Sequence, residues 1–368
     1  NRPIVVWNTT RSCNLRCVHC YIDAQAKKDK DELSTEQAKA MIDDLAAFGA
    51  PVLLFSGGEP FMRGDLFELG KYALSKGLRT VISTNGTLIT KDAAEKIKDA
   101  RFSYVGISLD GLEATNDKFR KESGAIKKTL QGIRNCLSSG VRAGLRFTIN
   151  KHNFHDVPGI FDLVEKEGIQ RACFYHLVYA GRGSEMIKDD LAPQQARDVM
   201  DIIFDRSIRL CRENLDTEIL TVDNHADGVY LYLRLQKEDK KKAREVLDLL
   251  KINGGNKSGI GIADVDNLGS VHPDQFWRHY SLGNVKTRRF SEIWSDESDG
   301  LLRGLRNRRA LLKGKCGRCH FQEICGGNFR VRAEAVYGDV WQEDPACYLS
   351  EDEITDKVCH SFTSFRTA

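Results

Sequence analysis

The sequence has no long apolar run, no marked excess of charge of one sign, and no internal repeat or low-complexity segment. Because no stretch of about 18 apolar residues occurs, we expect no membrane-spanning helix. With 55 basic and 52 acidic residues, the formal net charge of +3 is too small to indicate a nucleic-acid partner. The first residues do not resemble a signal peptide. These absences predict a water-soluble cytoplasmic protein that binds neither membranes nor nucleic acid.

Cysteine is too sparse for a disulfide-stapled secreted scaffold, with 11 residues in 368, but several cysteines are grouped. Cys13, Cys17 and Cys20 have gaps of three and two residues and can place three thiolates around one iron–sulfur cube. No fourth cysteine lies nearby, so one iron would remain open, whereas ordinary ferredoxin sites close every iron with cysteine. Zinc is the alternative, but a three-residue gap is unusual for zinc. His19 could be a further ligand, although we expect it to point away.

Short apolar runs alternate with amphipathic stretches in the first half, as in βα units on a parallel sheet. We expect strands at Ile4–Thr9, Val52–Ser56, Thr80–Ser83, Tyr104–Leu109, Gly144–Ile149 and Ala172–Leu177. Helices are expected at Ser34–Phe48, Asp65–Lys76, Lys91–Ala100, Gly124–Ser138 and Phe154–Glu167, the first with a capping-box pattern at Ser34 and Gln37. Six strands with right-handed crossovers predict an α/β fold, a partial (β/α)6 barrel.

We divide the chain into three parts. Residues 1–215 form the partial barrel, 216–255 a helical connector, and 256–368 a smaller C-terminal domain. Further helices are expected at Gln194–Asn214, at Lys237–Leu250 with an exposed charged face, and at Ser291–Leu305.

The polar motifs of the first half lie at predicted strand ends, where barrels of this kind carry their active sites. The cysteine run follows the first strand, and Arg146 lies on the fifth. With an aromatic residue, Tyr21, directly after Cys20, the chain resembles the radical S-adenosylmethionine (radical SAM) superfamily. The resemblance continues in order through Ser56-Gly57-Gly58-Glu59-Pro60, Ser83-Thr84-Asn85-Gly86 and Ser108-Leu109-Asp110-Gly111. Taken alone, Gly57-Gly58 and Asp110-Gly111 could also be simple turns.

The resemblance implies that Cys13, Cys17 and Cys20 hold a 4Fe–4S cluster and that SAM chelates its open iron. Reduction of the cluster, by a donor such as ferredoxin or flavodoxin, would cleave SAM to a 5′-deoxyadenosyl radical. The residues that would hold SAM are Gly57, Gly58, Glu59, Asn85, Ser108, Asp110, Arg146 and Tyr21. Among them, Arg146 can pair with the SAM carboxylate and Tyr21 can lie beside adenine.

A second cysteine group lies near the end of the chain, at Cys316, Cys319, Cys325 and Cys347. It resembles the SPASM extension of many radical SAM enzymes, which usually carries two auxiliary clusters. Here Phe329 stands where a further cysteine is usual, and residues 259–274 contain no cysteine. We therefore expect one auxiliary 4Fe–4S cluster, with a structural zinc as the alternative. Cys136, Cys173 and Cys211 are expected to be buried inert thiols, and whether Cys359 is a ligand stays open.

Three segments, Tyr175–Gly183, Asp264–Val285 and Cys325–Leu349, resemble radical SAM enzymes that modify tetrapyrroles. The similarity is strongest to deacetylases that convert 12,18-didecarboxysiroheme into Fe-coproporphyrin III by removing two acetate side chains. NirJ-type enzymes of heme d1 biosynthesis, which remove propionate, are the alternative, and the heme synthases of the same pathway are more distant.

An iron tetrapyrrole implies cationic, aromatic and imidazole partners. His176, His272 and His279 could ligate iron or donate a proton, Arg182, Arg278, Arg330 and Arg332 could grip carboxylates, and Trp277, with Phe276 and Tyr280, could cover the ring. For any one of these residues a core or surface role is the alternative. A radical peptide maturase and a non-catalytic iron–sulfur or heme carrier are the other functional alternatives. Maturases often have an N-terminal leader-binding domain that these residues do not show, and a carrier leaves the SAM motifs without a role.

Overall fold

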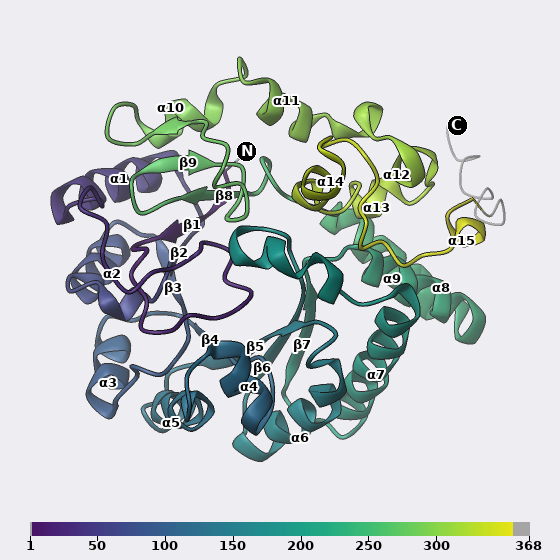
Figure 1. The fold of residues 1–368 in the computed structure, drawn as a ribbon, viewed down its shortest axis with the longest axis horizontal. Coiled ribbons are helices and arrows are strands. Elements are labelled where there is room, and N and C mark those ends of the chain that lie inside the picture. Colours follow the sequence, from purple (N-terminus) through teal and green to yellow (C-terminus); the bar gives the residue numbers. More distant parts are fainter. Residues whose placement is uncertain (1, 356–368) are drawn as a thin grey trace.

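A curved ten-stranded sheet forms the centre of the computed structural model, which describes residues 2–355 (Figure 1). The strand order is β10-β9-β8-β1-β2-β3-β4-β5-β6-β7. Pairing is parallel from β8 through β1 to β7, and antiparallel where β9 pairs with β8 and β10. The strands are β1 Ile4–Asn8, β2 Val52–Ser56, β3 Arg79–Thr84, β4 Val105–Ser108, β5 Ala143–Ile149, β6 Arg171–His176, β7 Glu218–Val222, β8 Ile262–Val265, β9 Ser270–His272 and β10 Gly283–Asn284.

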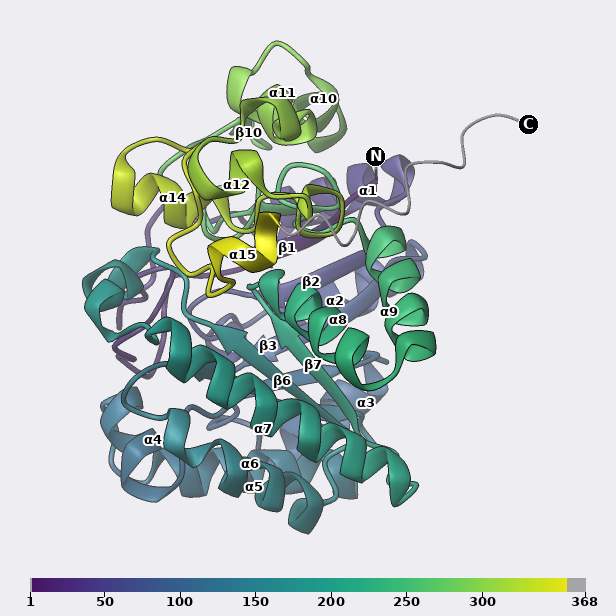
Figure 2. The same ribbon diagram turned by 90° about the vertical axis from the view of Figure 1, so that its right-hand side faces the viewer.

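Helices α1, α2, α3, α5, α6 and α7 line the outside of the sheet (Figure 1). The helices through the middle of the chain are α1 Thr35–Phe48, α2 Leu66–Ser75, α3 Lys91–Asp99, α4 Glu113–Arg120, α5 Ala125–Ser138, α6 Val157–Glu167, α7 Pro193–Arg212, α8 Ala226–Glu238 and α9 Lys240–Asn253. The tail helices are α10 Phe290–Ser295, α11 Gly300–Arg306, α12 Gly314–Arg318, α13 Gln322–Cys325, α14 Arg330–Tyr337 and α15 Glu351–Thr355. These tail helices gather at one end of the molecule (Figure 2).

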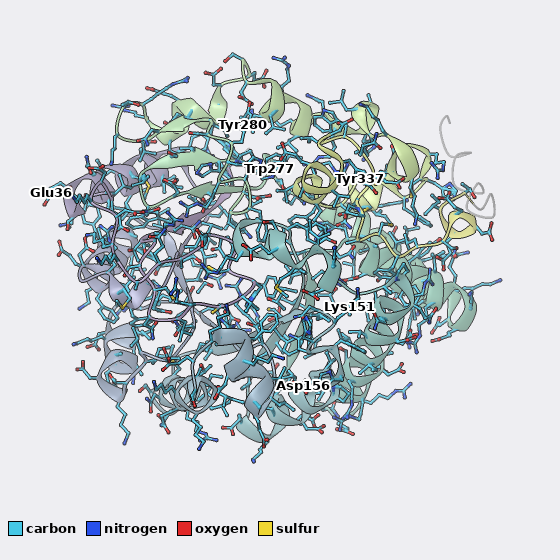
Figure 3. All side chains as sticks on the ribbon, in the orientation of Figure 1. Glu36, Lys151, Asp156, Trp277, Tyr280 and Tyr337 are labelled. Atoms are coloured by element: carbon cyan, nitrogen blue, oxygen red, sulfur yellow. The ribbon has the colours of Figure 1, made fainter. Side chains whose placement is uncertain are left out.

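The main core lies between the sheet and its outer helices. Large residues stand opposite one another in the parallel register, as where Trp7 pairs with Phe55 and Phe147 with Phe174. All four are fully buried, since helices cover the outer face of the parallel strands. Trp277 likewise lies inside the molecule, whereas Glu36 projects from its edge (Figure 3).

The six expected strands and the helices between them are confirmed, including the capping box of Ser34 and Gln37 at α1. The sequence analysis did not predict α4 or the strand β7, and it gave no bounds for the short strands β8–β10. The prediction of a purely helical connector is wrong at Glu218–Val222, because these residues form β7 and extend the sheet beyond β6.

Two expected helices are each interrupted by an aspartate cap. Asp239 is extended, and its carboxylate accepts from the N–H groups of Lys241 and Lys242, so α8 ends there and α9 begins. Asp299 accepts from Leu302 N–H in the same way and separates α11 from α10. Aspartate competes for backbone donors, which is why it starts helices more readily than it continues them. No helix within residues 2–355 has the length and apolar character needed to cross a membrane.

Candidate active site

Cys13, Cys17 and Cys20 lie together in the cysteine loop, residues 9–34, which joins β1 to α1. Every sulfur accepts hydrogen bonds from the protein: Cys13 from Leu15 N–H (3.4 Å) and the Asn85 side-chain amide (3.9 Å), Cys17 from the Arg120 guanidinium (3.4 Å) and Cys20 from Ala24 N–H (3.3 Å). Burial, with the neighbouring thiols, raises the pKa of Cys13 to about 12 and also raises that of Cys17. Three such thiolates cannot coexist here without a compensating positive group. The donor set therefore fits an iron–sulfur cluster, because metal binding deprotonates a thiol outright.

The glycine motif after β2 packs directly on the cysteine loop. Gly58 N–H donates to Thr10 O (2.7 Å), and Glu59 N–H donates to Ser12 O (2.8 Å). A Cβ atom on Gly58 would stand 2.2 Å from Ser12 O, and one on Gly57 would stand 2.6 Å from Thr10 O. Only glycine permits this approach of two backbones, so the motif fixes the position of the cysteines.

Glu59 is completely buried, and its carboxylate is bound by the end of β3. It accepts from Thr84 Oγ1 (2.7 Å) and Asn85 N–H (2.9 Å), while desolvation raises its pKa to about 7. Asn85 in turn donates its amide N–H to Asn14 Oδ1 (2.9 Å) in the cysteine loop. In this structure both side chains hold the loops together.

A buried ionic network reaches Cys17 from the other side. Asp110 pairs with Arg120 and with His19 Nε2 (3.2 Å), and it accepts from Thr148 N–H (2.9 Å). Burial lowers the pKa of His19 to about 4, which leaves its ring neutral. Asp110 thereby orients both the arginine that contacts a cysteine sulfur and the imidazole between two cysteines.

An inner chamber opens at the carboxyl ends of the strands, with about 730 Å³ of empty space. Of the residues expected at the site, Tyr21, Ser108, Arg146 and His176 line this chamber. Arg146 donates to Ser83 and lies 4.7 Å from the ring of Tyr175. The Tyr21 hydroxyl donates to Asn8 Oδ1 (2.9 Å) and lies 3.0 Å from Ser56 Oγ.

The sequence analysis did not place the chamber residues Thr148, Asp223 and Gln275 at the site, and His19 lines the chamber as well. His19 was expected to point away from the cluster. Its position between two cysteines of a tight loop was nevertheless a sequence signal that it lies at the site. Asp223 directly follows β7, Glu218–Val222, so recognising that strand would have placed a carboxyl group at the active-site edge of the sheet.

A larger, more open outer cavity, with about 1080 Å³ of empty space, adjoins the chamber and shares Tyr21 and Phe276 with it. Arg278 and His279 line this cavity, together with Arg11 and Glu334. His279 is half exposed, and its Nε2 lies 2.7 Å from Glu334. The two cavities therefore meet at the aromatic side chains of Tyr21 and Phe276.

The structure does not bring the remaining expected substrate residues to either cavity with a free polar group. The Arg182 guanidinium binds Cys17 O (2.9 Å) and Asp23 (2.6 Å). His272 donates from Nδ1 to Tyr280 O (2.8 Å) inside the core, and Trp277 is fully buried. Arg330 and Arg332 are also fully buried, the former against Gly327 O and Cys316 Sγ.

The four tail cysteines line one small apolar cavity with about 380 Å³ of empty space. Cys316 Sγ accepts from Asp344 N–H (3.4 Å), and Cys319 Sγ accepts from Phe321 N–H (3.4 Å). Burial and the other three cysteines raise the pKa of Cys325. As at the first group, this donor set suits a multiply charged metal centre. Cys211 is exposed on α7, so the expectation that it is buried is wrong, and Cys359 lies outside the described residues.

Comparisons with known proteins agree with this geometry. The family model of the radical SAM superfamily matches residues 7–164. The chain is 58% identical to Fe-coproporphyrin III synthase of Methanosarcina barkeri over 356 residues, covering 96% of this chain and 89% of the relative. The chain belongs to the radical SAM superfamily.

Two further similarities bear on this radical SAM enzyme. It is 42% identical to pre-heme d1 synthase of Dinoroseobacter shibae, with 96% of this chain and 87% of the relative covered. Its fold matches Streptococcus suis SuiB bound to S-adenosylmethionine with a TM-score of 0.72 at 17% identity, covering 94% of this chain and 77% of SuiB.

Proposed function

We propose that this enzyme removes the acetate side chains of 12,18-didecarboxysiroheme and forms Fe-coproporphyrin III. The observation that carries the proposal is the 58% identity to Fe-coproporphyrin III synthase along nearly the whole chain. The lower identity to pre-heme d1 synthase supports, as the second candidate, NirJ-type removal of propionate. Heme biosynthesis is the context in both cases.

Cys13, Cys17 and Cys20 are the proposed ligands of a 4Fe–4S cluster. With SAM bound, a reduced cluster of this kind supplies a 5′-deoxyadenosyl radical, which removes hydrogen from an unactivated carbon. Arg146 offers a guanidinium to the SAM carboxylate from the chamber wall, and Ser108 and Tyr21 complete that wall. Gly57, Gly58, Glu59, Asn85 and Asp110 contribute by fixing the cysteine loop, as their contacts with it indicate.

The tail cysteines Cys316, Cys319, Cys325 and Cys347 are the proposed ligands of a second, auxiliary 4Fe–4S cluster in a SPASM-like extension. Zinc is the competing occupant. Within the described residues no three His, Cys, Asp or Glu side chains converge closely enough for a single metal ion. Metal analysis of the anaerobically reconstituted protein decides between them: about eight irons per chain support two clusters, whereas about four irons with one zinc support the competitor.

We place the macrocycle in the outer cavity, with one acetate arm reaching the inner chamber past Tyr21 and Phe276. Arg278 at this cavity can pair with a carboxylate arm, and His279 can approach the iron. The rings of Tyr21 and Phe276, whose centroids are 5.4 Å apart, offer an apolar surface between the two cavities. A reduced ferredoxin or flavodoxin of the cytoplasm is the proposed electron source.

The test is anaerobic turnover of the reconstituted enzyme with SAM, a reductant and 12,18-didecarboxysiroheme, followed by mass spectrometry. Two successive acetate losses with matching 5′-deoxyadenosine establish the deacetylase. Loss of propionate moves the enzyme to the heme d1 branch. Formation of 5′-deoxyadenosine with an untouched tetrapyrrole refutes the substrate while retaining the radical chemistry.

A further inference from the structure

Asp223 is a buried carboxyl group that lines the inner chamber and follows the last strand of the sheet. Its backbone is held in the left-handed region, at a φ of 67°, where residues other than glycine are uncommon. The Asp223 carbonyl oxygen accepts from Arg332 Nη2 (2.8 Å), which fixes this conformation from α14. Strained positions of this kind gather at functional sites.

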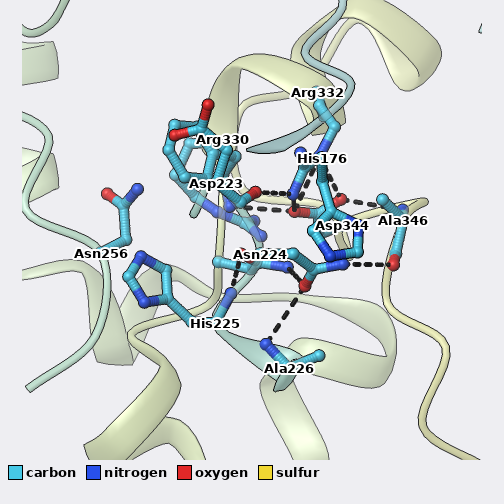
Figure 4. A network of polar contacts seen from close by, with 12 residues as sticks. His176, Asp223, Asn224, His225, Ala226, Asn256, Arg330, Arg332, Asp344 and Ala346 are labelled. Carbon is cyan, nitrogen blue, oxygen red and sulfur yellow. Dashed lines mark hydrogen bonds and ion pairs between the residues drawn. The ribbon is translucent and has the colours of Figure 1, made fainter. Parts of the chain in front are cut away.

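The carboxyl oxygens of Asp223 form no hydrogen bond or ion pair with any residue of the described chain. The neighbouring His176 differs, because its Nε2 lies 3.1 Å from Asp227, whose other oxygen accepts from the Tyr348 hydroxyl (2.8 Å). Figure 4 shows Asp223 beside His176 and Arg332, in a network that continues to Asp344. Of Asp223, Asp227 and Asp344, Asp223 lines the chamber, and its carboxyl group is the one without a partner in the described part of the chain.

The surroundings of Asp223 favour its neutral form. Desolvation raises its pKa to about 7, and Asp274 adds to the increase, whereas Arg332, Arg146 and His176 oppose it. Tyr175 also faces the chamber beside Arg146. A neutral carboxyl group is a hydrogen-bond donor, and its natural partner is a carboxylate oxygen.

Helix α14 connects Asp223 with the outer cavity. Val331 and Glu334 of this helix line the outer cavity, while Arg332, on the same helix, holds the Asp223 backbone. A molecule in the outer cavity reaches the inner chamber past Tyr21 and Phe276, which line both cavities, and Asp223 lines that chamber. The cysteine loop and Arg146 occupy the wall proposed for SAM.

We propose that Asp223, in its protonated form, recognises the substrate by donating a hydrogen bond to the carboxylate of the acetate arm that enters the inner chamber. This inference rests on the proposed function, since it takes the acetate-bearing tetrapyrrole as the ligand. Asp223 is then a specificity-determining residue that distinguishes the substrate from its product, because the product has lost its acetate arms.

The experiment measures dissociation constants for 12,18-didecarboxysiroheme and Fe-coproporphyrin III, from tetrapyrrole absorbance, with the reconstituted holoenzyme at about pH 6 and about pH 8. A group that titrates near 7 changes its protonated fraction about tenfold over this range, so wild-type affinity for the substrate falls about tenfold. Asp223→Asn keeps a donor that does not titrate and is expected to bind the substrate equally at both pH values. Asp223→Ala is expected to bind it weakly at both, and to form 5′-deoxyadenosine without matching acetate loss.

Two controls isolate the effect. Product binding should be the same for all variants, which also shows that they are folded. Asp216→Asn, an exposed change just before β7, should behave as wild type. If Asp223→Asn binds the substrate as weakly as Asp223→Ala, or if product affinity falls with pH as substrate affinity does, the inference is overturned. A wild-type enzyme that binds neither tetrapyrrole overturns the proposed function together with the inference, whereas normal wild-type turnover with unaffected Asp223 variants overturns the inference alone.

Discussion

Replacing Arg332 by methionine should be among the most destabilising single changes in this protein. The arginine is fully buried and donates to Asp344 from Nε (3.0 Å) and Nη2 (2.9 Å). It also donates to Leu177 O (3.1 Å) and Asp223 O (2.8 Å). Methionine fills a similar volume but satisfies none of these acceptors.

The size of the destabilisation follows from the contacts that Asp344 keeps once the arginine is gone. Asp344 keeps the N–H groups of Phe329 and Ala346, both at 2.9 Å, but it loses the guanidinium that holds its pKa below the ordinary value. Removing one partner of a buried ion pair costs about 3–5 kcal/mol. Unfolding entropy of roughly 2.1 cal/mol/K per residue gives about 0.8 kcal/mol/K for 368 residues. The apparent thermal midpoint should therefore fall by about 4–6 °C.

Anaerobic differential scanning calorimetry at one scan rate measures this shift. Arg318→Met is the matched control, because Arg318 makes a similar two-point contact with Glu351 in which both side chains are more than half exposed. An exposed pair is worth about 0–1 kcal/mol, so the control midpoint should move by about 1 °C or less. Adding Asp344→Asn to Arg332→Met should recover part of the loss, because it removes the uncompensated charge. Equal midpoints for the two arginine variants would refute the argument that burial makes the Arg332–Asp344 pair worth several kcal/mol more than an exposed pair.

Three further predictions concern the site and its support. Cys13→Ser should abolish SAM cleavage, whereas Cys347→Ala should retain part of it while lowering iron content, as measured by 5′-deoxyadenosine formation and metal analysis. Tyr21→Phe removes a hydroxyl that contacts Asn8 and Ser56, so it should weaken SAM binding only about fivefold, which corresponds to about 1 kcal/mol. Tyr21→Ala also removes the ring and should weaken SAM binding further. Binding titrations with SAM compare the two variants. Asp264 is fully buried, and desolvation raises its pKa to about 7 from 3.8. Between about pH 4 and 7 the folded state thus keeps a proton that the unfolded state loses, so the free energy of unfolding falls as pH rises through this range. Denaturant unfolding at about pH 5 and about pH 8 measures the fall. In Asp264→Asn the difference between the two pH values should be smaller by a few kcal/mol.

The sequence predicts the barrel well because its first six strands are short apolar runs separated by amphipathic helices. β7 was missed because its pattern is mixed: Glu218 and Leu220 are exposed, whereas Ile219, Thr221 and Val222 are half-buried. An edge strand of this kind has no continuous apolar face from which it could be predicted. The strands β8–β10 are short, and the pairing of β8 with β1 joins segments more than 250 residues apart, which local patterns cannot encode.

The site is predictable to the level of its motifs and no further. Spacing identifies the cysteines and the glycine motif, because both are local in sequence. It does not identify which charged residues remain free. Arg182 and Arg332 have the right chemistry for carboxylates, yet their guanidinium groups bind Asp23 and Asp344 within the protein. Asp223 has no sequence motif, and its role depends on a strand and an arginine from distant parts of the chain.

The two cysteine groups are joined to the inner chamber by different walls, and this separates their roles. The first group meets the chamber through His19 and Tyr21, next to residues proposed for SAM. The tail group meets it through Asp344, whose N–H donates to Cys316 Sγ and whose carboxylate pairs with the arginine that holds Asp223. A change at the tail site should therefore alter substrate recognition before it alters SAM cleavage. Cys347→Ala that still cleaves SAM in part, but loses more of its acetate removal than of its cleavage, is the pattern that this arrangement predicts.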